Sequence, residues 1–195
     1  MEIDLVHGPQ IACHVIDIAD GPLDVRAAID FVSDDAHGGI DVFIGRVRAA
    51  SHGRQCIAIH YDMFDPLSLN VFRAAAAAAV ERFGPKAKCY VAHAKGRLIV
   101  AELAVVVAFG SPHRDESFRG CREVIEAIKH QAPIWKQEHF ADGHSEWSEG
   151  CSLCDHGPAS TIVADTHHGH AHHGHAHDGH AHHDHAHHDR GDVRA

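Results

Sequence analysis

The sequence predicts an α+β fold with antiparallel hairpins and about three helices. Runs rich in β-branched residues alternate with helical patterns, and the connections favour hairpins over the long crossovers of a doubly wound sheet. After Trp147 the composition changes abruptly, and 13 of the 22 residues from 167 to 188 are histidine. Such a segment has almost nothing to bury, so we expect a folded domain over residues 1–150 and a disordered tail over residues 151–195.

The first third of the chain predicts a strand, a helix and a hairpin. Loose alternation of apolar residues predicts a strand over residues 11–18, and Pro22 opens a helix over about residues 23–32. β-rich runs over residues 40–45 and 56–61 flank a polar turn, so we expect them to pair as a hairpin. The arginines expected around its loop are Arg46, Arg48 and Arg54.

The middle of the chain predicts an alanine-rich helix and two strands. Asp65 is expected to be an N-cap, with Pro66 at the first helical position and the helix continuing over residues 67–83. Two strands are expected over residues 88–93 and 102–109, on either side of a Lys-Gly-Arg segment. The second strand is apolar on both faces, which predicts a central place in a sheet.

A last helix is predicted over residues 115–131, between two basic segments. Its apolar residues recur at helical spacing: Phe118, Cys121, Val124, Ile125 and Ile128. Ser-Pro-His-Arg at 111–114 precedes the helix, and Pro133 ends it, so that Lys136 follows in extended chain. Lys129 lies at the edge of the apolar face, where its amine can reach a cleft. This arrangement predicts an anion pocket.

Charge and hydropathy exclude several classes of function. The formal net charge is −10, which argues against a general binder of nucleic acid or of anionic membranes. The N-terminus lacks the pattern of a signal peptide, and no apolar run approaches the ~20 residues that span a bilayer, so we expect a cytoplasmic protein. Four scattered cysteines are expected to be buried, reduced thiols: Cys13, Cys56, Cys89 and Cys121.

Four short blocks of sequence, taken in order along the chain, point to a known family. They are Phe-Ile-Gly-Arg-Val-Arg at 43–48, Ser-Pro-His-Arg at 111–114, Ile-Lys-His-Gln-Ala-Pro-Ile-Trp-Lys at 128–136 and Glu-Trp at 146–147. Taken together, they resemble the catalytic (large) subunit family of molybdopterin synthase. The resemblance implies an α/β-hammerhead fold and a homodimer that becomes a heterotetramer by binding a small ubiquitin-like subunit at each end.

The resemblance also implies a sulfurtransferase reaction. In that family, the C-terminal Gly-Gly thiocarboxylate of the small subunit delivers sulfur to cyclic pyranopterin monophosphate, and two transfers make the dithiolene of molybdopterin. The partner brings the sulfur, so no cofactor is implied for catalysis. On this chain the resemblance makes Lys129 the essential amine and Lys136 the second catalytic lysine. It also makes Arg48, His113 and Arg114 the anion-binding group.

The chemistry of this reaction asks for cations independently of the resemblance. A phosphate and a thiocarboxylate must meet, and guanidinium and ammonium groups offset their repulsion. A lysine beside a second cation has its neutral form favoured, so Lys129 suits a general base or a nucleophile, and both roles stay open. In isolation Lys129 would be interpreted as a solvated residue at a helix end.

The C-terminal segment suggests a different function. Cys151 and Cys154, followed by His156, form half of a zinc site, which His144 or a tail histidine could complete. A solvated, reduced pair explains the two cysteines equally well. The tail histidines are expected to bind Ni²⁺, Zn²⁺ or Cu²⁺. The alternatives to catalysis are therefore a metal-binding or storage protein, and a degenerate family member that only binds a ubiquitin-like partner.

Overall fold

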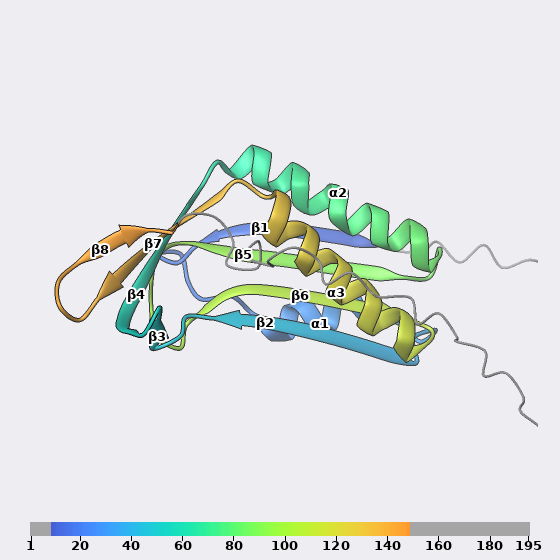
Figure 1. Ribbon diagram of the computed structural model, residues 1–195. Coiled ribbons are helices and arrows are strands. Elements are labelled where there is room, and N and C mark those ends of the chain that lie inside the picture. The colour runs from blue at the N-terminus through green and yellow to red at the C-terminus, as the bar shows by residue number, and fades with distance from the viewer. Residues whose placement is uncertain (1–8, 149–195) are drawn as a thin grey trace, which may run out of the picture. The chain divides into compact units, whose positions relative to one another are not determined.

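The computed structural model of this protein describes residues 9–148, so the expected domain boundary near residue 150 and the tail lie outside the described residues. The strands are β1 (Ile11–Asp17), β2 (Gly39–Arg46), β3 (Ala50–Ser51), β4 (Arg54–Met63), β5 (Lys88–Ile99), β6 (Leu103–Ser111), β7 (Ile134–Phe140) and β8 (Ser145–Trp147). The helices are α1 (Val25–Val32), α2 (Asp65–Phe83) and α3 (Arg114–Gln131). The strands join in the order β2-β6-β5-β4-β7-β8, with β1 beside β5 and β3 beside β4 (Figure 1). The α+β prediction is confirmed.

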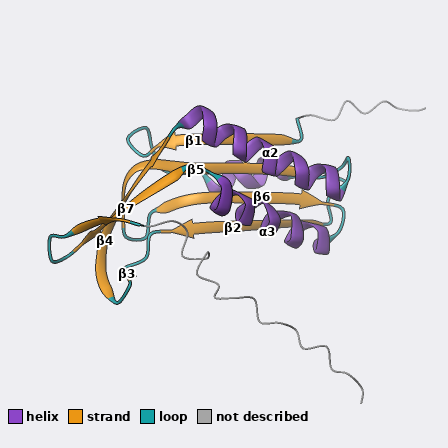
Figure 2. Ribbon diagram, turned by 45° about the horizontal axis from the view of Figure 1, so that its top comes forward, coloured by secondary structure: helices purple, strands orange, loops and turns teal. Residues whose placement is uncertain are grey.

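The valine-rich strand β6 lies between β2 and β5 and contributes to both hydrophobic cores. One set of alternate residues packs under α2 and α3: Val105, Val107 and Phe109. The other set packs toward α1: Ala104, Val106 and Ala108. Helices α2 and α3 therefore cover one face of the sheet and α1 covers the other (Figures 1 and 2). The predicted central position of this strand is confirmed.

Capping residues determine where α1 begins and where α2 begins and ends. Helix α1 begins at Val25, later than predicted, because the Asp24 carboxylate caps it by accepting two backbone N–H groups. Helix α2 is capped by the backbone of Phe64, so the prediction of Asp65 as N-cap is wrong by one position. Asp65 instead takes the first helical position, where a carboxylate suits the helix dipole. The helix ends at Gly84, whose φ of 103° favours glycine.

The predicted hairpin between residues 40–45 and 56–61 is wrong. Strand β2 pairs antiparallel with β6, whereas β4 pairs with β5 and β7. The polar turn closes only the short β3–β4 ladder. The reason is that β2 carries apolar side chains on both faces, with Val42 in the α1 core and Phe43 in the α2–α3 core. Such a strand needs helical cover on both sides, which it finds beside β6.

The expected break between two strands near residue 96 is also wrong. Strand β5 continues through Gly96 to Ile99, and the chain turns afterwards at Ala101, which has a φ of 76°. Gly96 has a φ of 97° and pairs with Tyr61 of β4, at the point where β5 leaves β1 and β6. One strand therefore joins the helix-covered sheet to the β4–β7–β8 sheet.

Helix α3 packs as predicted except at one residue. The buried residues that were predicted are Cys121, Val124, Ile125 and Ile128. Phe118 was predicted to join them but is 58% exposed, and Ser117 and Gly120 face the sheet instead. A Cβ on Gly120 would lie 2.6 Å from the Phe109 ring, so the helix approaches β6 too closely for a larger residue. Pro133 precedes β7 as expected, whereas β8 was not predicted.

Two further expectations concern compartment. Within residues 9–148, no helix is long and apolar enough to cross a membrane. The four cysteines of this range are free thiols, and three of them are buried as predicted, whereas Cys13 is partly exposed.

Leu98→Ala is expected to lower the free energy of unfolding by about 2–5 kcal/mol, because Leu98 is fully buried on β5 in the α1 core. Leu67→Ala on α2 is the matched control, since Leu67 is 49% exposed, and we expect a loss below about 1 kcal/mol. Urea unfolding measures both changes. Equal losses would contradict the assigned core.

Candidate functional site

Lys129 lies in the last turn of α3, on the rim of its buried face. Its neighbours Ile125 and Ile128 are buried, whereas Lys129 is exposed. Its Nζ lies 5.6 Å above the centre of the Phe43 ring on β2, a distance that permits a cation–π contact. Lys129 forms no ion pair within residues 9–148, so its amine is available to a ligand.

Lys136, by contrast, is held by a buried carboxylate. Its Nζ lies 2.8 Å from Oε1 of Glu138, which is only 2% exposed, and both side chains leave β7 on the same face. Burial alone raises the pKa of Glu138, but hydrogen bonds from Lys136, Ser51 and Ser148 outweigh it and keep the pKa below its ordinary value. The sequence offered Lys136 and not Glu138, although a Lys-x-Glu spacing on a strand indicates such a pair.

Arg48 lies in the loop after β2, on the side of Tyr61. Tyr61 pairs with Lys136 across the β4–β7 ladder. Burial, with the nearby Glu138 carboxylate, raises the pKa of Tyr61 to about 12, and the charge of Arg48 opposes that rise. The phenol therefore stays protonated at neutral pH and can donate a hydrogen bond. Tyr61 therefore lies opposite Lys136 and within the electrostatic influence of Arg48, and sequence reasoning did not identify it.

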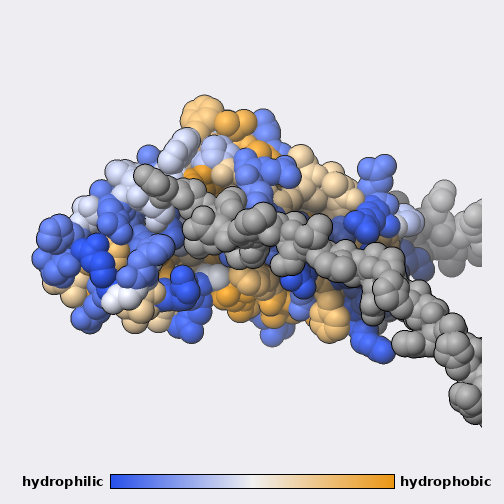
Figure 3. All heavy atoms as spheres, viewed as in Figure 1, coloured by the Kyte–Doolittle hydropathy of each residue, from blue (hydrophilic) through white to orange (hydrophobic). Residues whose placement is uncertain are grey.

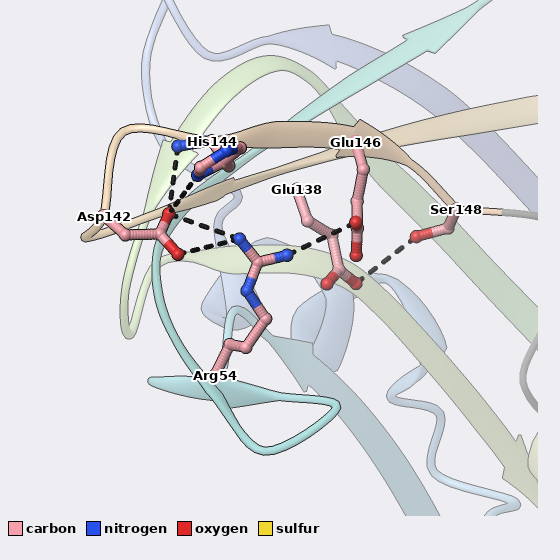
Figure 4. A network of polar contacts seen from close by, with 6 residues as sticks. All are labelled: Arg54, Glu138, Asp142, His144, Glu146 and Ser148. Atoms are coloured by element: carbon pink, nitrogen blue, oxygen red, sulfur yellow. Dashed lines mark hydrogen bonds and ion pairs between the residues drawn. The ribbon is translucent and has the colours of Figure 1, made fainter.

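The other two arginines of this region have structural partners. Arg46 donates from Nε to the carbonyl oxygen of Ala101 at 2.9 Å. Arg54 donates to Asp142 at 2.9 Å and to Glu146 at 3.3 Å, and so fastens the β7–β8 turn (Figure 4). Its guanidinium also lies 3.8 Å from the centre of a buried phenylalanine ring in β7. Of these three arginines, Arg48 is the one that has neither a side-chain hydrogen bond nor an ion pair within the described part of the chain.

His113 and Arg114 lie at the opposite end of α3. His113 is the N-cap residue but makes no side-chain capping bond, and Arg114 is the first residue of the helix. Both side chains are exposed. Arg114 opposes the positive end of the helix dipole, whereas Asp115 and Glu116 in the first turn suit it. The first turn also leaves backbone N–H groups free, and such groups suit an anion.

The length of α3 separates these cations into two groups. Arg114 and Lys129 are fifteen residues apart, which at the helical rise corresponds to about 22 Å. Figure 1 shows the C-terminal end of α3 beside β7 and its N-terminal end near the start of β2. One protomer therefore does not bring all five predicted residues to one small molecule.

The predicted metal ligands Cys151, Cys154, His156 and the tail histidines lie outside the described residues, so this site stays a prediction. His144, offered as a further ligand, lies in the β7–β8 turn with Nδ1 3.2 Å from an Asp142 carboxylate oxygen (Figure 4). Within residues 9–148, no three His, Cys, Asp or Glu side chains are grouped to hold a metal ion.

This fold and its cations define a class, namely an α+β protein with exposed basic side chains at the two ends of one surface helix. Residues 18–131, more than half of the chain, match the family described as MoaE protein. The molybdopterin synthase catalytic subunit of Synechococcus elongatus is 40% identical over 141 residues, covering 72% of this chain and 86% of that protein. The chain therefore belongs to the MoaE family of molybdopterin synthase catalytic subunits, which are sulfurtransferases of molybdenum cofactor biosynthesis.

Other relatives agree with this assignment. The molybdopterin synthase catalytic subunit of Nostoc sp. is 37% identical over 126 residues, covering 65% of this chain and 76% of that protein. Molybdopterin synthase from Staphylococcus aureus superimposes with a TM-score of 0.64 at 29% identity, covering 73% of this chain and 98% of that one. A complex of subunits 1 and 2 of molybdopterin-converting factor from Helicobacter pylori shares the fold, with a TM-score of 0.56, 20% identity, and coverage of 70% and 90%.

Glu138→Gln is expected to lower the free energy of unfolding by about 2 kcal/mol at pH 7, because it breaks a largely buried ion pair. The folded state lowers the pKa of Glu138, so its stabilisation is present above about pH 4.5 and is lost as the pH falls further. The difference from wild type should therefore stay constant from pH 7 to about pH 5 and shrink as the pH falls below about 4.5 in denaturant unfolding.

Glu146→Gln is the matched control, since Glu146 is 52% exposed in its pair with Arg54. We expect a loss below about 1 kcal/mol. A Glu138→Gln difference that does not change with pH would show that the carboxylate charge is not the source of the stabilisation.

Proposed function

We propose that this chain transfers sulfur from the C-terminal thiocarboxylate of a small ubiquitin-like subunit to cyclic pyranopterin monophosphate, and so builds the dithiolene of molybdopterin. The observation that carries the proposal is that the chain belongs to the MoaE family and that four exposed basic side chains in its family-like sequence blocks have no side-chain hydrogen bond or ion pair within residues 9–148. These are Arg48, His113, Arg114 and Lys129. The free thiols support a reducing, cytoplasmic location.

The two lysines are proposed to have different tasks. Lys129 is unpaired and stands on an aromatic ring at the rim of the helix, so it is the amine proposed to act as base or nucleophile. Lys136 is fixed by Glu138, so its ammonium occupies a defined place without reorganisation and suits the stabilisation of a thiocarboxylate or of the charge that develops on transfer. Tyr61 adds a neutral hydrogen-bond donor beside Lys136.

The remaining cations are proposed to bind the substrate anions. Arg48 lies on the lysine side of the domain, whereas His113 and Arg114 lie at the free N-terminus of α3. Arginine and helix N–H groups both suit phosphate. Because about 22 Å separates the two groups, we propose that a second copy of the chain brings its His113 and Arg114 to the Lys129 of the first.

Exposed apolar surface supports such protein partners. It appears in Figure 3 as separate patches along the upper and lower edges of the domain, between charged residues. The large exposed apolar residues are Ile40, Ile44, Ile57, Phe64, Leu67, Ile99, Phe118, Trp135 and Trp147. A homodimer and a small sulfur-carrier subunit together would use this surface, and the two-subunit complex from Helicobacter pylori supports the second partner. Binding of Zn²⁺ or Ni²⁺ by the tail stays a separate prediction.

Lys129→Ala is expected to reduce the rate of dithiolene formation by about 10²–10⁴-fold, because the variant removes the proposed reacting amine. Lys136→Ala should reduce it as well. The assay uses the full chain, a thiocarboxylated small subunit and cyclic pyranopterin monophosphate. Lys86→Ala, at an exposed lysine before β5, is the matched control and should retain full activity. Activity in Lys129→Ala equal to that of Lys86→Ala would refute the proposed role.

Mixing Lys129→Ala with Arg114→Ala protomers tests whether the site is shared. Each variant alone should be nearly inactive. Random reassociation should restore about a quarter of wild-type activity, because half of the dimers are mixed and each of these holds one intact site. Unfolding and refolding the mixture together, followed by the same assay, measures this recovery. No recovery in a mixture that contains mixed dimers would place both residues in the same protomer's site.

A further inference from the structure

The two cations at the start of α3 have no side-chain bonds that orient them. Neither His113 nor Arg114 makes a side-chain hydrogen bond or ion pair within residues 9–148, and both are exposed. Their direction therefore depends on the backbone of the turn that joins β6 to α3. The backbone of that turn therefore sets the position of any anion site built from these two residues.

Two buried serines hold this turn from the inside. Ser111 and Ser117 are 0% and 1% exposed, and their Oγ atoms lie 2.9 Å apart. The Ser111 hydroxyl lies 2.8 Å from the carbonyl oxygen of His113, and the Ser117 hydroxyl lies 2.9 Å from the carbonyl oxygen of Gly39. Two hydroxyl protons serve three contacts, so one donates to a carbonyl oxygen and the other donates either to the second carbonyl or to the neighbouring hydroxyl oxygen. These contacts tie the turn at His113 to the last residue of β6, to α3 and to β2.

The start of β2 lies directly against the same turn. The Gly38 N–H donates to the Pro112 carbonyl oxygen at 3.2 Å. A Cβ on Gly38 would lie 2.6 Å from that oxygen, and a Cβ on Gly39 would lie 2.9 Å from Cα of Arg114. Any larger residue at these two positions would force the start of β2 away from the β6–α3 turn.

The segment before β2 is itself anchored. The two ring nitrogens of His37 lie 2.8 Å from the carbonyl oxygen of Val32 and 2.6 Å from that of Lys86. His37 thus links the end of α1 to the loop before β5, next to Gly38. The segment that supports the turn is therefore itself held by the end of α1 and by the loop before β5.

We infer that Ser117, together with Ser111, is a positioning residue that sets the backbone of the β6–α3 turn so that His113 and Arg114 face the phosphate of the substrate. The inference rests on the proposed anion-binding role of these two cations. Ser117 itself is buried and does not touch substrate, so it acts through the turn. Loss of its hydroxyl should weaken the binding of the phosphorylated substrate more than it slows the sulfur transfer step.

The test is steady-state sulfur transfer by the full chain with its thiocarboxylated small subunit, with cyclic pyranopterin monophosphate varied. Ser117→Ala should raise KM by about 10-fold with a smaller change in kcat. Ser68→Ala is the matched control, because Ser68 is also a fully buried serine at the fourth position of its helix, and its Oγ has no hydrogen-bond partner. Its KM should stay at the wild-type value. Ser111→Ala removes the other hydroxyl and repeats the test if Ser117→Ala does not fold.

A second arm separates positioning from general damage. In a His113→Ala/Arg114→Ala background, Ser117→Ala should cause no further rise in KM, because the groups it positions are gone. The same rise in both backgrounds would overturn the inference. If Arg114→Ala raises KM while Ser117→Ala behaves like Ser68→Ala, the inference fails and the anion-binding role stands. If Arg114→Ala leaves KM unchanged, the anion-binding role fails, and the inference fails with it.

Discussion

The packing of α3 against β2 and β6 determines where the free cations of this domain lie. Gly120 lets the helix approach the Phe109 ring closely, and buried aliphatic residues of the next turns continue the contact. A helix held in this way is a rigid rod of fixed length. It places Lys129 beside β2 and β7 and keeps Arg114 about 22 Å away. The proposed division of the site between two copies of the chain is based on this length and not on any feature of the substrate.

The cations differ in how they are held, and this difference suggests their tasks. Lys136 is bound to a buried carboxylate, and Arg54 is used to fasten the β7–β8 turn. Lys129 and Arg114 have no such partners among the described residues, so they can pair with ligand anions. In a chain of net charge −10, unpaired cations at two sites provide the local positive potential that anionic partners need. A fixed cation suits precise charge stabilisation, whereas a free one suits proton or group transfer.

Local patterns predicted the helices and most strands, because capping residues, proline and helical periodicity act over a few residues. Pairing depends on distant parts of the chain, and there the sequence failed. Strand β2 joined β6 instead of β4, and β5 continued through Gly96 to serve two sheets. The family-like sequence blocks indicated Lys129 and Lys136. Glu138 was missed although it lies two residues after Lys136 on the same strand, whereas Tyr61 comes to Lys136 only through the β4–β7 ladder. The separation of Arg114 from Lys129 required the folded helix.

The most direct test of a site shared between two protomers is a crystal structure of the dimer with cyclic pyranopterin monophosphate bound. We expect one ligand to contact Lys129 and Arg48 of one protomer and, through its phosphate, His113 and Arg114 of the other. A ligand whose protein contacts all come from a single protomer, with the start of the partner's α3 far from it, would contradict a shared site.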